Sequence, residues 1–397
     1  MEQNVRKNGI ISRFAAICAA AVLSLCGAAG YYAHSLPDRL VTSGDGAVSV
    51  QTLLPVTVHR EPPVGSERAE LRLFGVLPLK SVAVTSISPS AVYVGGEPFG
   101  IRMMMAGVMV VSLGEIHTAD GTASPAREAG IQVGDIIQTV NGRDICGNAD
   151  LQEAVACSGG ESVTVTLLRG GEELTRTVMP VFAPLTGRWQ TGMWVRDSTA
   201  GIGTVTYYAL TPAGEVQFAG LGHAVCDTDT GERIPLASGE VAAVEIRDVV
   251  RGTAGKPGEL RGTFQSQHNA GTLRSNTAGG VFGTLERLPA RQMLMPVAAG
   301  GEIRRGAAMI YATLQGSTPE AYSVQIEEIR ENDANMRNLV VHVTDSRLLE
   351  RSGGIVQGMS GSPIVQDGRL VGAVTHVFVK DPTRGYGIFA ENMLTAA

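Results

Sequence analysis

The sequence predicts a mainly β protein with an N-terminal membrane-spanning helix. The chain has 397 residues, which is too long for one ordinary domain and favours two or three. It contains 50 glycines and only 5% aromatic residues, a composition typical of short strands and tight turns rather than of a helical bundle. The net charge of -6 and the lack of a long basic run argue against nucleic-acid binding.

The helix is predicted from an apolar run near the N-terminus. Residues 14–33 are almost wholly apolar, which matches the roughly 20 residues that a helix needs to cross a bilayer. Arg6, Lys7 and Arg13 precede the run, so we expect the N-terminus in the cytoplasm and the body of the protein on the other side of the membrane. Because the run is long for a signal peptide, an uncleaved anchor over residues 1–34 is preferred to a cleaved one.

A stalk and a strand-rich segment are expected next. Residues 35–67 contain four prolines and scattered charge, which is typical of an extended linker. Such exposed linkers are common places of proteolytic cleavage. Over residues 68–98, β-branched residues alternate and turn residues interrupt them, so two or three strands are expected there.

The following segment, residues 99–184, has the element order of a PDZ domain. We expect an apolar strand pair over 98–113, a short helix starting at Pro125, a hairpin turn at Asn141-Gly142, a helix over 148–156 and a final hairpin. The stretch AGIQVGDIIQTVNG closely resembles the most recognisable part of that domain family.

The resemblance to PDZ domains implies a peptide-binding groove. Such domains take up a peptide as an added strand and bind its carboxylate on the backbone N–H groups of a loop. The loop that matches here carries Phe99, Gly100 and Ile101, and Leu151 and Val155 would line the side-chain pocket. Plain core packing is the alternative for these residues. The ligand would be a peptide C-terminus or a segment of this chain.

Residues 185–397 are predicted to form a pair of small barrels or a sandwich. Short strand-like runs recur there between glycines, and one helical stretch is expected near Met393.

A candidate nucleophile lies in the stretch GIVQGMSGSPIV, residues 354–365. Serine attacks a carbonyl when a base takes its proton and N–H donors meet the oxyanion. The N–H groups of Gly358 and Ser360 can converge on one point, which favours Ser360 over Ser362 as the nucleophile. A glycine-rich turn without a catalytic role would give the same short pattern.

Histidine is the expected base, and an acid should orient it. His223 follows a strand in FAGLGHAVC and is flanked by small residues, so it is preferred. The alternatives are His268, His342 and His376. The candidate acids are Asp345, which lies 15 residues before Ser360, and Asp227 and Asp229, which lie close to His223.

No metal or cofactor is expected. The cysteines outside the apolar run are Cys146, Cys157 and Cys226, an odd number that predicts free thiols rather than a disulfide framework, with a Cys146–Cys157 pair as the alternative. No cysteine–histidine spacing is typical of a zinc site.

Four stretches in the same order resemble the SpoIVB peptidases, the stage IV sporulation protein B family of endospore-forming bacteria. They are TGMWVRDSTAGIGTVTYY, FAGLGHAVCDTDTG, NTAGGVFG and VTDSRLLERSGGIVQGMSGSPIVQDGRLVGAVTHVFV. The resemblance implies a chymotrypsin-like double β-barrel after the PDZ domain, with Ser360 as nucleophile, His223 as base and Asp345 as acid. Gly358 and Ser360 would form the oxyanion hole. By analogy with trypsin-like enzymes, the residues facing the substrate peptide would be Thr375, His376 and Val377.

The resemblance also implies a role and a location. Such proteins cross the inner forespore membrane and cleave a membrane-bound regulator in the intermembrane space, which releases an intramembrane protease that activates a late sigma factor. Self-cleavage controlled by the PDZ domain is implied as well. The alternatives are a catalytically silent PDZ adaptor and an envelope quality-control serine protease, in which the PDZ domain usually follows the protease domain.

Overall fold

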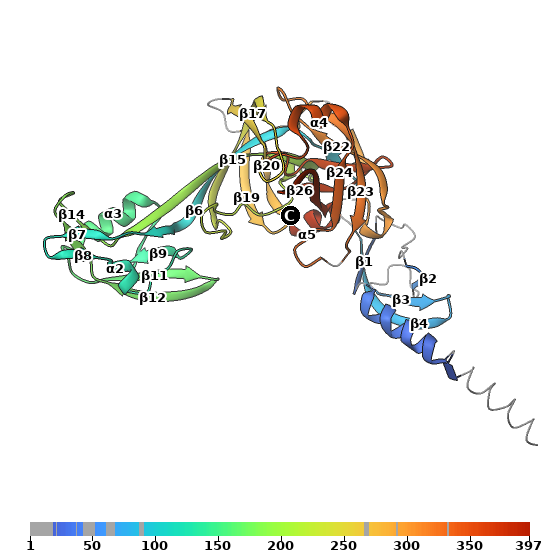
Figure 1. The fold of residues 1–397 in the computed structure, drawn as a ribbon, viewed down its shortest axis with the longest axis horizontal. Coiled ribbons are helices and arrows are strands. Elements are labelled where there is room, and N and C mark those ends of the chain that lie inside the picture. The colour runs from blue at the N-terminus through green and yellow to red at the C-terminus, as the bar shows by residue number, and fades with distance from the viewer. Residues whose placement is uncertain are drawn as a thin grey trace, which may run out of the picture.

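The computed structural model describes residues 19–20, 22–36, 38–42, 52–60, 68–86, 91–265, 270–290, 293–331 and 333–397. The chain is mainly β and has three parts (Figure 1): a small N-terminal sheet, a body of two β-barrels, and a lobe that a long two-stranded ribbon holds away from the body.

The first barrel is a ring of six strands. Around the ring they are β6 (Pro98–Leu113), β17 (Leu236–Val250), β19 (Gly271–Thr277), β20 (Gly280–Leu285), β16 (Val216–Gly220) and β15 (Met193–Leu210). The pairing of β15 with β6 closes the ring. Three further strands pair along its outside: β5 (Ala91–Val94), β18 (Glu259–Phe264) and β21 (Met293–Pro296). Phe99 and Phe218 meet edge to face in its core, with ring centroids 5.6 Å apart.

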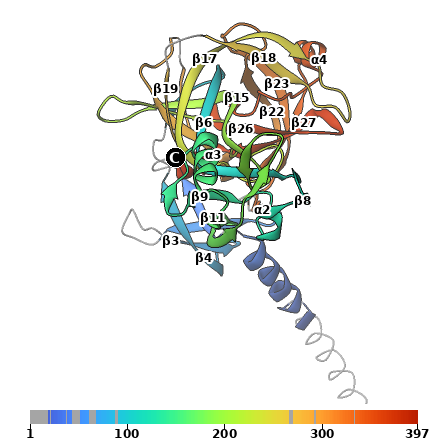
Figure 2. The ribbon, with the colours of Figure 1, turned by 90° about the vertical axis from the view of Figure 1, so that its left-hand side faces the viewer.

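The lobe has the element order expected of a PDZ domain. Its elements are β7 (Ile116–Thr118), β8 (Gly121–Ala123), α2 (Pro125–Glu128), β9 (Ile136–Val140), β10 (Arg143–Asp144), α3 (Asn148–Cys157), β11 (Val163–Arg169), β12 (Glu172–Val178), β13 (Val181–Ala183) and β14 (Arg188–Gln190). Figure 2 views this lobe from its own side, with α3, β9 and β11 in front of the barrels. Both residues of the turn at Asn141-Gly142 have positive φ, 51° and 75°, as a two-residue hairpin turn requires.

The lobe is inserted into the first barrel and does not precede it, so the expected boundaries at residues 98/99 and 184/185 do not separate the two units. The run expected to be a strand pair is the single strand β6, whose first half pairs with β15 and β17 in the barrel and whose second half pairs with β9 in the lobe. Gly107, at φ 100°, bends the strand where the two units meet but does not reverse it. An apolar run by itself cannot distinguish a bend from a turn.

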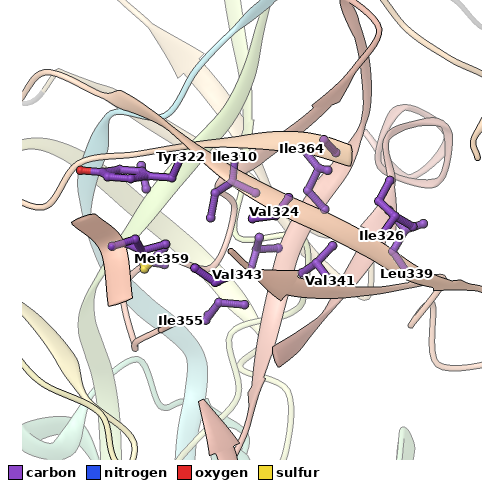
Figure 3. Close-up of a cluster of buried hydrophobic side chains, with 14 of the residues drawn as sticks. Ile310, Tyr322, Val324, Ile326, Leu339, Val341, Val343, Ile355, Met359 and Ile364 are labelled. Carbon is purple, nitrogen blue, oxygen red and sulfur yellow. The ribbon is translucent and has the colours of Figure 1, made fainter. Parts of the chain in front are cut away.

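The second barrel is closed by β22 (Gly306–Ala312), β23 (Glu320–Ile329), β24 (Leu339–Val343), β27 (Asp381–Phe389), β26 (Arg369–Phe378) and β25 (Pro363–Gln366), in that order. Its core is a tight set of aliphatic side chains, among them Ile310, Val324 and Ile364 (Figure 3). The expected helix near Met393 is α5 (Ala390–Ala396). The helix α4 (Ser346–Ser352) and the 3-10 turn η1 (Gly300–Glu302) are not predicted by the sequence pattern.

The segment expected to be a stalk contributes to a small folded sheet. Its strands β1 (Arg39–Thr42) and β2 (Val56–Arg60) join β3 (Arg68–Leu73) and β4 (Leu77–Ser86) in the order β1-β4-β3-β2. Residues 22–35 are helical, and Tyr32 in this helix packs against the sheet near Leu71. Part of the apolar run 14–33 lies outside the described residues, and within the described residues no helix is long and apolar enough to cross a membrane.

Candidate active site

Two loops from different barrels meet at one end of β26. The Ser360 hydroxyl donates a hydrogen bond of 2.6 Å to the carbonyl of Thr375. The ring of His223 lies against the ring of His376, the next residue along β26, with centroids 4.6 Å apart. The fold therefore brings Ser360 and His223, which are far apart in the sequence, to the same place between the barrels.

The loop that carries Ser360 is held by β15 of the first barrel. The N–H of Thr204 donates to the carbonyl of Ser360 at 2.9 Å, and its hydroxyl donates to the carbonyl of Gly358 at 2.8 Å. The hydroxyl of Thr206 donates to the carbonyl of Gly361, also at 2.8 Å. Gly361 has φ 95°, and a Cβ there would lie 1.9 Å from the Thr204 carbonyl oxygen, so this approach requires glycine.

The backbone around Ser360 leaves two N–H groups unbonded. The N–H groups that donate to backbone carbonyls are those of Gln357, Met359, Gly361 and Ser362. Those of Gly358 and Ser360 have no acceptor among the described residues. Because these two donors flank Met359, whose side chain is fully buried in the second barrel (Figure 3), the loop has the donor pattern of an oxyanion hole.

The two serines of the loop differ in access. Ser360 is half-buried, whereas Ser362 is fully buried and its hydroxyl has no hydrogen-bond partner in the described part of the chain. Only Ser360 can therefore meet a substrate without a rearrangement of the barrel.

His223 is held in the tautomer that a base needs. Its Nδ1 lies 2.8 Å from the carbonyl oxygen of Ala224, which can only accept, so the proton is on Nδ1 and the lone pair is on Nε2. Burial lowers the pKa of His223, and the bond to Ala224 opposes this in part. Protein atoms packed around part of the exposed His376 ring, together with the charges of His223 and Arg337, lower the pKa of His376 to about 4. Both rings are therefore neutral near pH 7.

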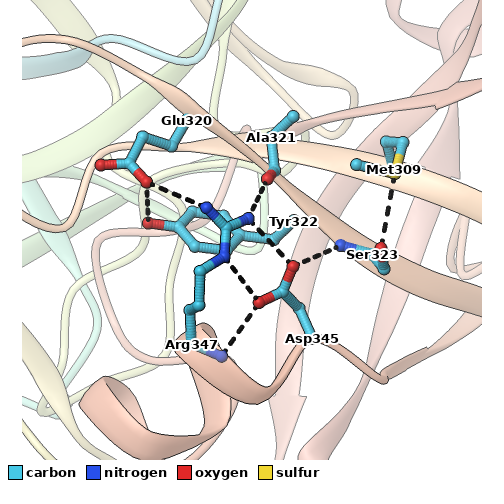
Figure 4. A network of polar contacts seen from close by, with 7 residues as sticks. All are labelled: Met309, Glu320, Ala321, Tyr322, Ser323, Asp345 and Arg347. Atoms are coloured by element: carbon cyan, nitrogen blue, oxygen red, sulfur yellow. Dashed lines mark hydrogen bonds and ion pairs between the residues drawn. The ribbon is translucent and has the colours of Figure 1, made fainter.

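Asp345 is not placed against His223, in contrast to the expected triad. It caps α4: its carboxylate accepts from the N–H of Arg347 at 3.0 Å and from the N–H of Ser323 at 3.2 Å, and it pairs with the Arg347 guanidinium (Figure 4). Hydrogen bonds from Arg347 hold the pKa of Asp345 below its ordinary value. The sequence pattern does not predict α4, and an Asp at the start of a helix binds backbone N–H groups, so the role of Asp345 as the acid stays a prediction.

The other candidate acids are also engaged elsewhere. Asp227 and Asp229 both pair with Arg196. Within the described residues no carboxylate is hydrogen-bonded to His223, so the Ala224 carbonyl is the group that orients its ring. Of the other histidines, His342 pairs with Glu327 on the second barrel, and His268 lies outside the described residues.

The residues expected to face a substrate peptide differ in their orientation. The Thr375 side chain is buried, and it is the Thr375 carbonyl that meets Ser360. His376 is exposed beside His223. Val377 packs against the core of the second barrel. Of the three, only His376 presents its side chain at the surface of the site.

The expected carboxylate loop of the PDZ-like lobe is part of the first barrel instead. Phe99 and Ile101 are each 3% exposed and pair with β15 and β17, and a Cβ on Gly100 would lie 2.1 Å from the ring of Phe264. A glycine between apolar residues occurs in more than one place in this sequence. The pairing with β15 that prevents residues 99–101 from binding a carboxylate involves residues more than 90 positions away, so the local pattern does not reveal it.

A groove lies between α3 and the start of β15. Leu151 and Val155 line a cavity of about 1050 Å³ between α3 and residues 188–195. Gly192, at φ 81°, immediately precedes β15 there. Residues 193–195 pair only with β6 in the described structure, so their other edge faces the groove. The stretch Thr191-Gly192-Met193 was the missed signal, since it also places a glycine before an apolar strand.

Among the described residues no group of three or more His, Cys, Asp or Glu side chains could hold a metal ion. The four described cysteines are free and exposed, so Cys146 and Cys157 are not paired here.

Two β-barrels with a serine and a histidine at their junction, and a PDZ domain inserted in the first barrel, define a serine peptidase of the double-barrel kind. The sequence profile described as SpoIVB peptidase S55 matches residues 187–394, more than half of the chain, and a PDZ domain profile matches residues 120–169. The chain belongs to the SpoIVB peptidase S55 family.

Individual relatives match parts of the chain. The "Putative zinc metalloprotease mll0638" of Mesorhizobium japonicum is 35% identical over 98 residues, which are 23% of this chain and 27% of that protein, so the chain spans about a quarter of its length. The PDZ domain of an SdrC-like protein (Lmo2051) from Listeria monocytogenes is 18% identical, with a TM-score of 0.19, over 23% of this chain and 87% of that one. The Rv3671c protease in an inactive form is 15% identical, with a TM-score of 0.28, over 49% of this chain and 81% of that one.

Proposed function

We propose that this protein is a membrane-associated signalling endopeptidase that cleaves a membrane-bound regulatory protein, and itself, and so triggers an intramembrane protease that activates a late sporulation sigma factor. Its body would lie in the space between the forespore membranes, anchored through residues 14–33. Family membership supports the role, and the apolar run after three basic residues supports the anchor.

The observation that carries the catalytic part is the junction of the barrels. There Ser360, two unbonded N–H groups and a neutral His223 with a free Nε2 lie together. Ser360 attacks the scissile carbonyl while His223 Nε2 takes its proton, and the N–H groups of Gly358 and Ser360 stabilise the tetrahedral oxyanion. His223 then gives the proton to the leaving amine, and water hydrolyses the acyl-enzyme.

The reaction requires one side-chain movement. The Ser360 hydroxyl donates to the Thr375 carbonyl, so its proton is turned away from a base. Rotation about χ1 would bring Oγ toward His223, at the loss of one hydrogen bond, which is about 1 kcal/mol. The Ala224 carbonyl, at Nδ1, would support the imidazolium that forms.

The groove beside α3 is proposed to bind the protein substrate, or a segment of this chain, as an added strand. Leu151 and Val155 offer an apolar wall, and the free edge of residues 193–195 offers backbone groups. A peptide C-terminus is the ligand class that such a groove favours.

A catalytically silent PDZ adaptor is the second candidate. It is favoured by the absence of a carboxylate on His223 in the described structure and by the bond from Ser360 to Thr375. An envelope quality-control protease is disfavoured, because the PDZ domain here interrupts the first barrel rather than following the second.

Labelling of the full chain with a fluorophosphonate probe distinguishes these functions. The peptidase predicts label on Ser360, identified by mass spectrometry, none on Ser360→Ala, and greatly slowed labelling of His223→Ala. Folded wild-type protein that takes no label in the presence or absence of C-terminal peptides would favour the adaptor. Fluorescent fusions in sporulating cells would test the location, and a cytoplasmic signal would contradict it.

A further inference from the structure

Strand β15 of the first barrel contacts the PDZ groove, the loop of Ser360 and the loop of His223. At its start, residues 193–195 of β15 line the PDZ groove. Near its end, Thr204 and Thr206 hold the loop of Ser360. Between these points, Arg196 reaches the loop that carries His223.

Arg196 clasps this histidine loop, residues 221–235, with two ion pairs. Its Nη1 binds the carboxylate of Asp227, and its Nη2 lies 2.6 Å from Oδ2 of Asp229. Two separate N–H groups of one guanidinium thereby fix two carboxylates in relation to each other, as a planar fork can and an ammonium cannot.

Asp227 organises the same loop from within. Its side chain is 1% exposed, and its Oδ1 accepts hydrogen bonds from the N–H groups of Asp229 and Thr230, both at 3.0 Å. Burial acts to raise the pKa of Asp227, but the hydrogen bonds from Thr230, Arg196 and Asp229 lower it, so the carboxylate stays charged. A buried charge of this kind is strongly destabilising once its partner is removed.

The loop has a second anchor nearer to its base. The Asn276 side chain on β19 accepts from the N–H of Val225 and donates to the carbonyls of Val225 and Ile234. Asn276 therefore holds the two ends of the loop together, whereas Arg196 holds its tip, four residues beyond His223, against β15.

The neighbour of Arg196 on β15 holds the other wall of the groove. Oδ2 of Asp197 accepts from the N–H of Asn148 at 3.0 Å, at the first residue of α3. Because successive side chains of a strand point to opposite faces, Arg196 and Asp197 reach different partners from adjacent positions.

We propose that Arg196 is a positioning residue for catalysis: through the histidine loop it holds the imidazole of His223 in the position from which it can take the proton of Ser360. Arg196 also links this loop to β15, the strand that forms a wall of the PDZ groove. This inference rests on the proposed peptidase reaction at Ser360. Arg196 touches neither the substrate nor the reacting atoms, and it acts only through Asp227 and Asp229.

The chain offers a matched control. Arg169 pairs with Asp135 inside the PDZ domain, and there too the carboxylate is 1% exposed while the arginine is 28% exposed, against 34% for Arg196. Arg169→Gln and Arg196→Gln therefore break similar pairs, but only Arg196 contacts the histidine loop.

The experiment compares these variants in the full chain. We expect the rate of fluorophosphonate labelling at Ser360 to fall by about tenfold to a hundredfold in Arg196→Gln, because a misplacement of about 1 Å has effects of that size. The labelling rate of Arg169→Gln should stay within about twofold of wild type while its melting temperature falls as much as that of Arg196→Gln. Equal slowing in both variants, or no slowing in Arg196→Gln, would overturn the inference.

Two further measurements keep the test decisive. Asp229→Asn removes the more exposed half of the clasp and keeps the buried pair, so it should fold and show a smaller slowing even if Arg196→Gln does not fold. The NMR signals of the His223 ring should shift and titrate at a different pH in Arg196→Gln or Asp229→Asn, but not in Arg169→Gln. These signals report positioning without activity, so an unlabelled wild type would count against the proposed function, whereas unmoved signals would count against the role of Arg196.

Discussion

The serine loop and the histidine loop meet at the same end of β26, but they are held in different ways. The serine loop is fixed by backbone groups and by hydroxyls of β15, and Gly361 brings it into direct contact with that strand. The histidine loop is held at its tip by ion pairs and at its base by one asparagine side chain. The nucleophile is thus preorganised by main-chain contacts, whereas the position of the base depends on ion pairs and hydrogen bonds of side chains.

The largest effect is expected at the nucleophile itself. Ser360→Ala should lower peptidase activity about 10⁴-fold or more, because nothing else in the loop can form the acyl-enzyme. Ser362→Ala is the control: it removes a fully buried hydroxyl that lacks a partner in the described structure, so activity and melting temperature should stay near wild type. Hydrolysis of a peptide library would measure both, and activity retained in Ser360→Ala would exclude this serine.

The contact of the serine loop with β15 is tested by Gly361→Ala. A Cβ at Gly361 would lie 1.9 Å from the Thr204 carbonyl oxygen, in addition to the strain of φ 95°. We expect a loss of roughly 2–4 kcal/mol in the free energy of unfolding, measured in denaturant, together with loss of activity.

Gly368→Ala is the matched control for this strain. Gly368 has φ 73° but open space around it, so roughly 1 kcal/mol should be lost and activity kept. Similar losses in both variants would show that the close approach to Thr204 adds nothing.

The role of Asp345 separates a triad from a dyad. If it acts only as the cap of α4, Asp345→Ala should lower the free energy of unfolding by about 1 kcal/mol and change activity by less than about tenfold. A fall in activity near 10⁴-fold, at unchanged stability, would mean that Asp345 reaches His223 in the active state and that the loops rearrange on activation.

The smallest effect is a shift in pH dependence. Because burial lowers the pKa of His223, the labelling rate of Ser360 should rise with pH through a midpoint below the ordinary histidine value of about 6.5. His376→Ala should admit water to the ring of His223, raise its pKa and move that midpoint upward. A midpoint that stays in place would show that His376 does not shield the base.

The same shifts fix the sign of the acid dependence of stability. The pKa of His376 is lowered to about 4 in the folded protein, so the unfolded chain takes up this proton at a higher pH. The free energy of unfolding should therefore fall as the pH drops from the ordinary histidine range toward 4. The fall should be smaller in His376→Gln, as urea titrations at several pH values would show.

Local patterns predicted several parts of this molecule. The turn at Asn141-Gly142, the short helix at Pro125 and the helix with Leu151 and Val155 each depend on residues close together in the sequence. The family and the serine peptidase class followed from motifs whose order along the chain is itself sequence information. The preference for Ser360 over Ser362 also depends on a short loop, in which Ser360 is half-buried and Ser362 is fully buried.

Only the tertiary structure decided which distant residues meet. Phe99, Gly100 and Ile101 pair with β15 and β17 instead of forming a carboxylate loop, and Asp345 caps α4 rather than contacting His223 in this structure. The insertion of the PDZ domain and the clasp of Arg196 on the histidine loop likewise depend on β15 returning to the barrel beside β6. Composition and turn chemistry are set within a few residues, whereas strand partners and ion pairs depend on contacts between segments far apart in the chain, which no short pattern encodes.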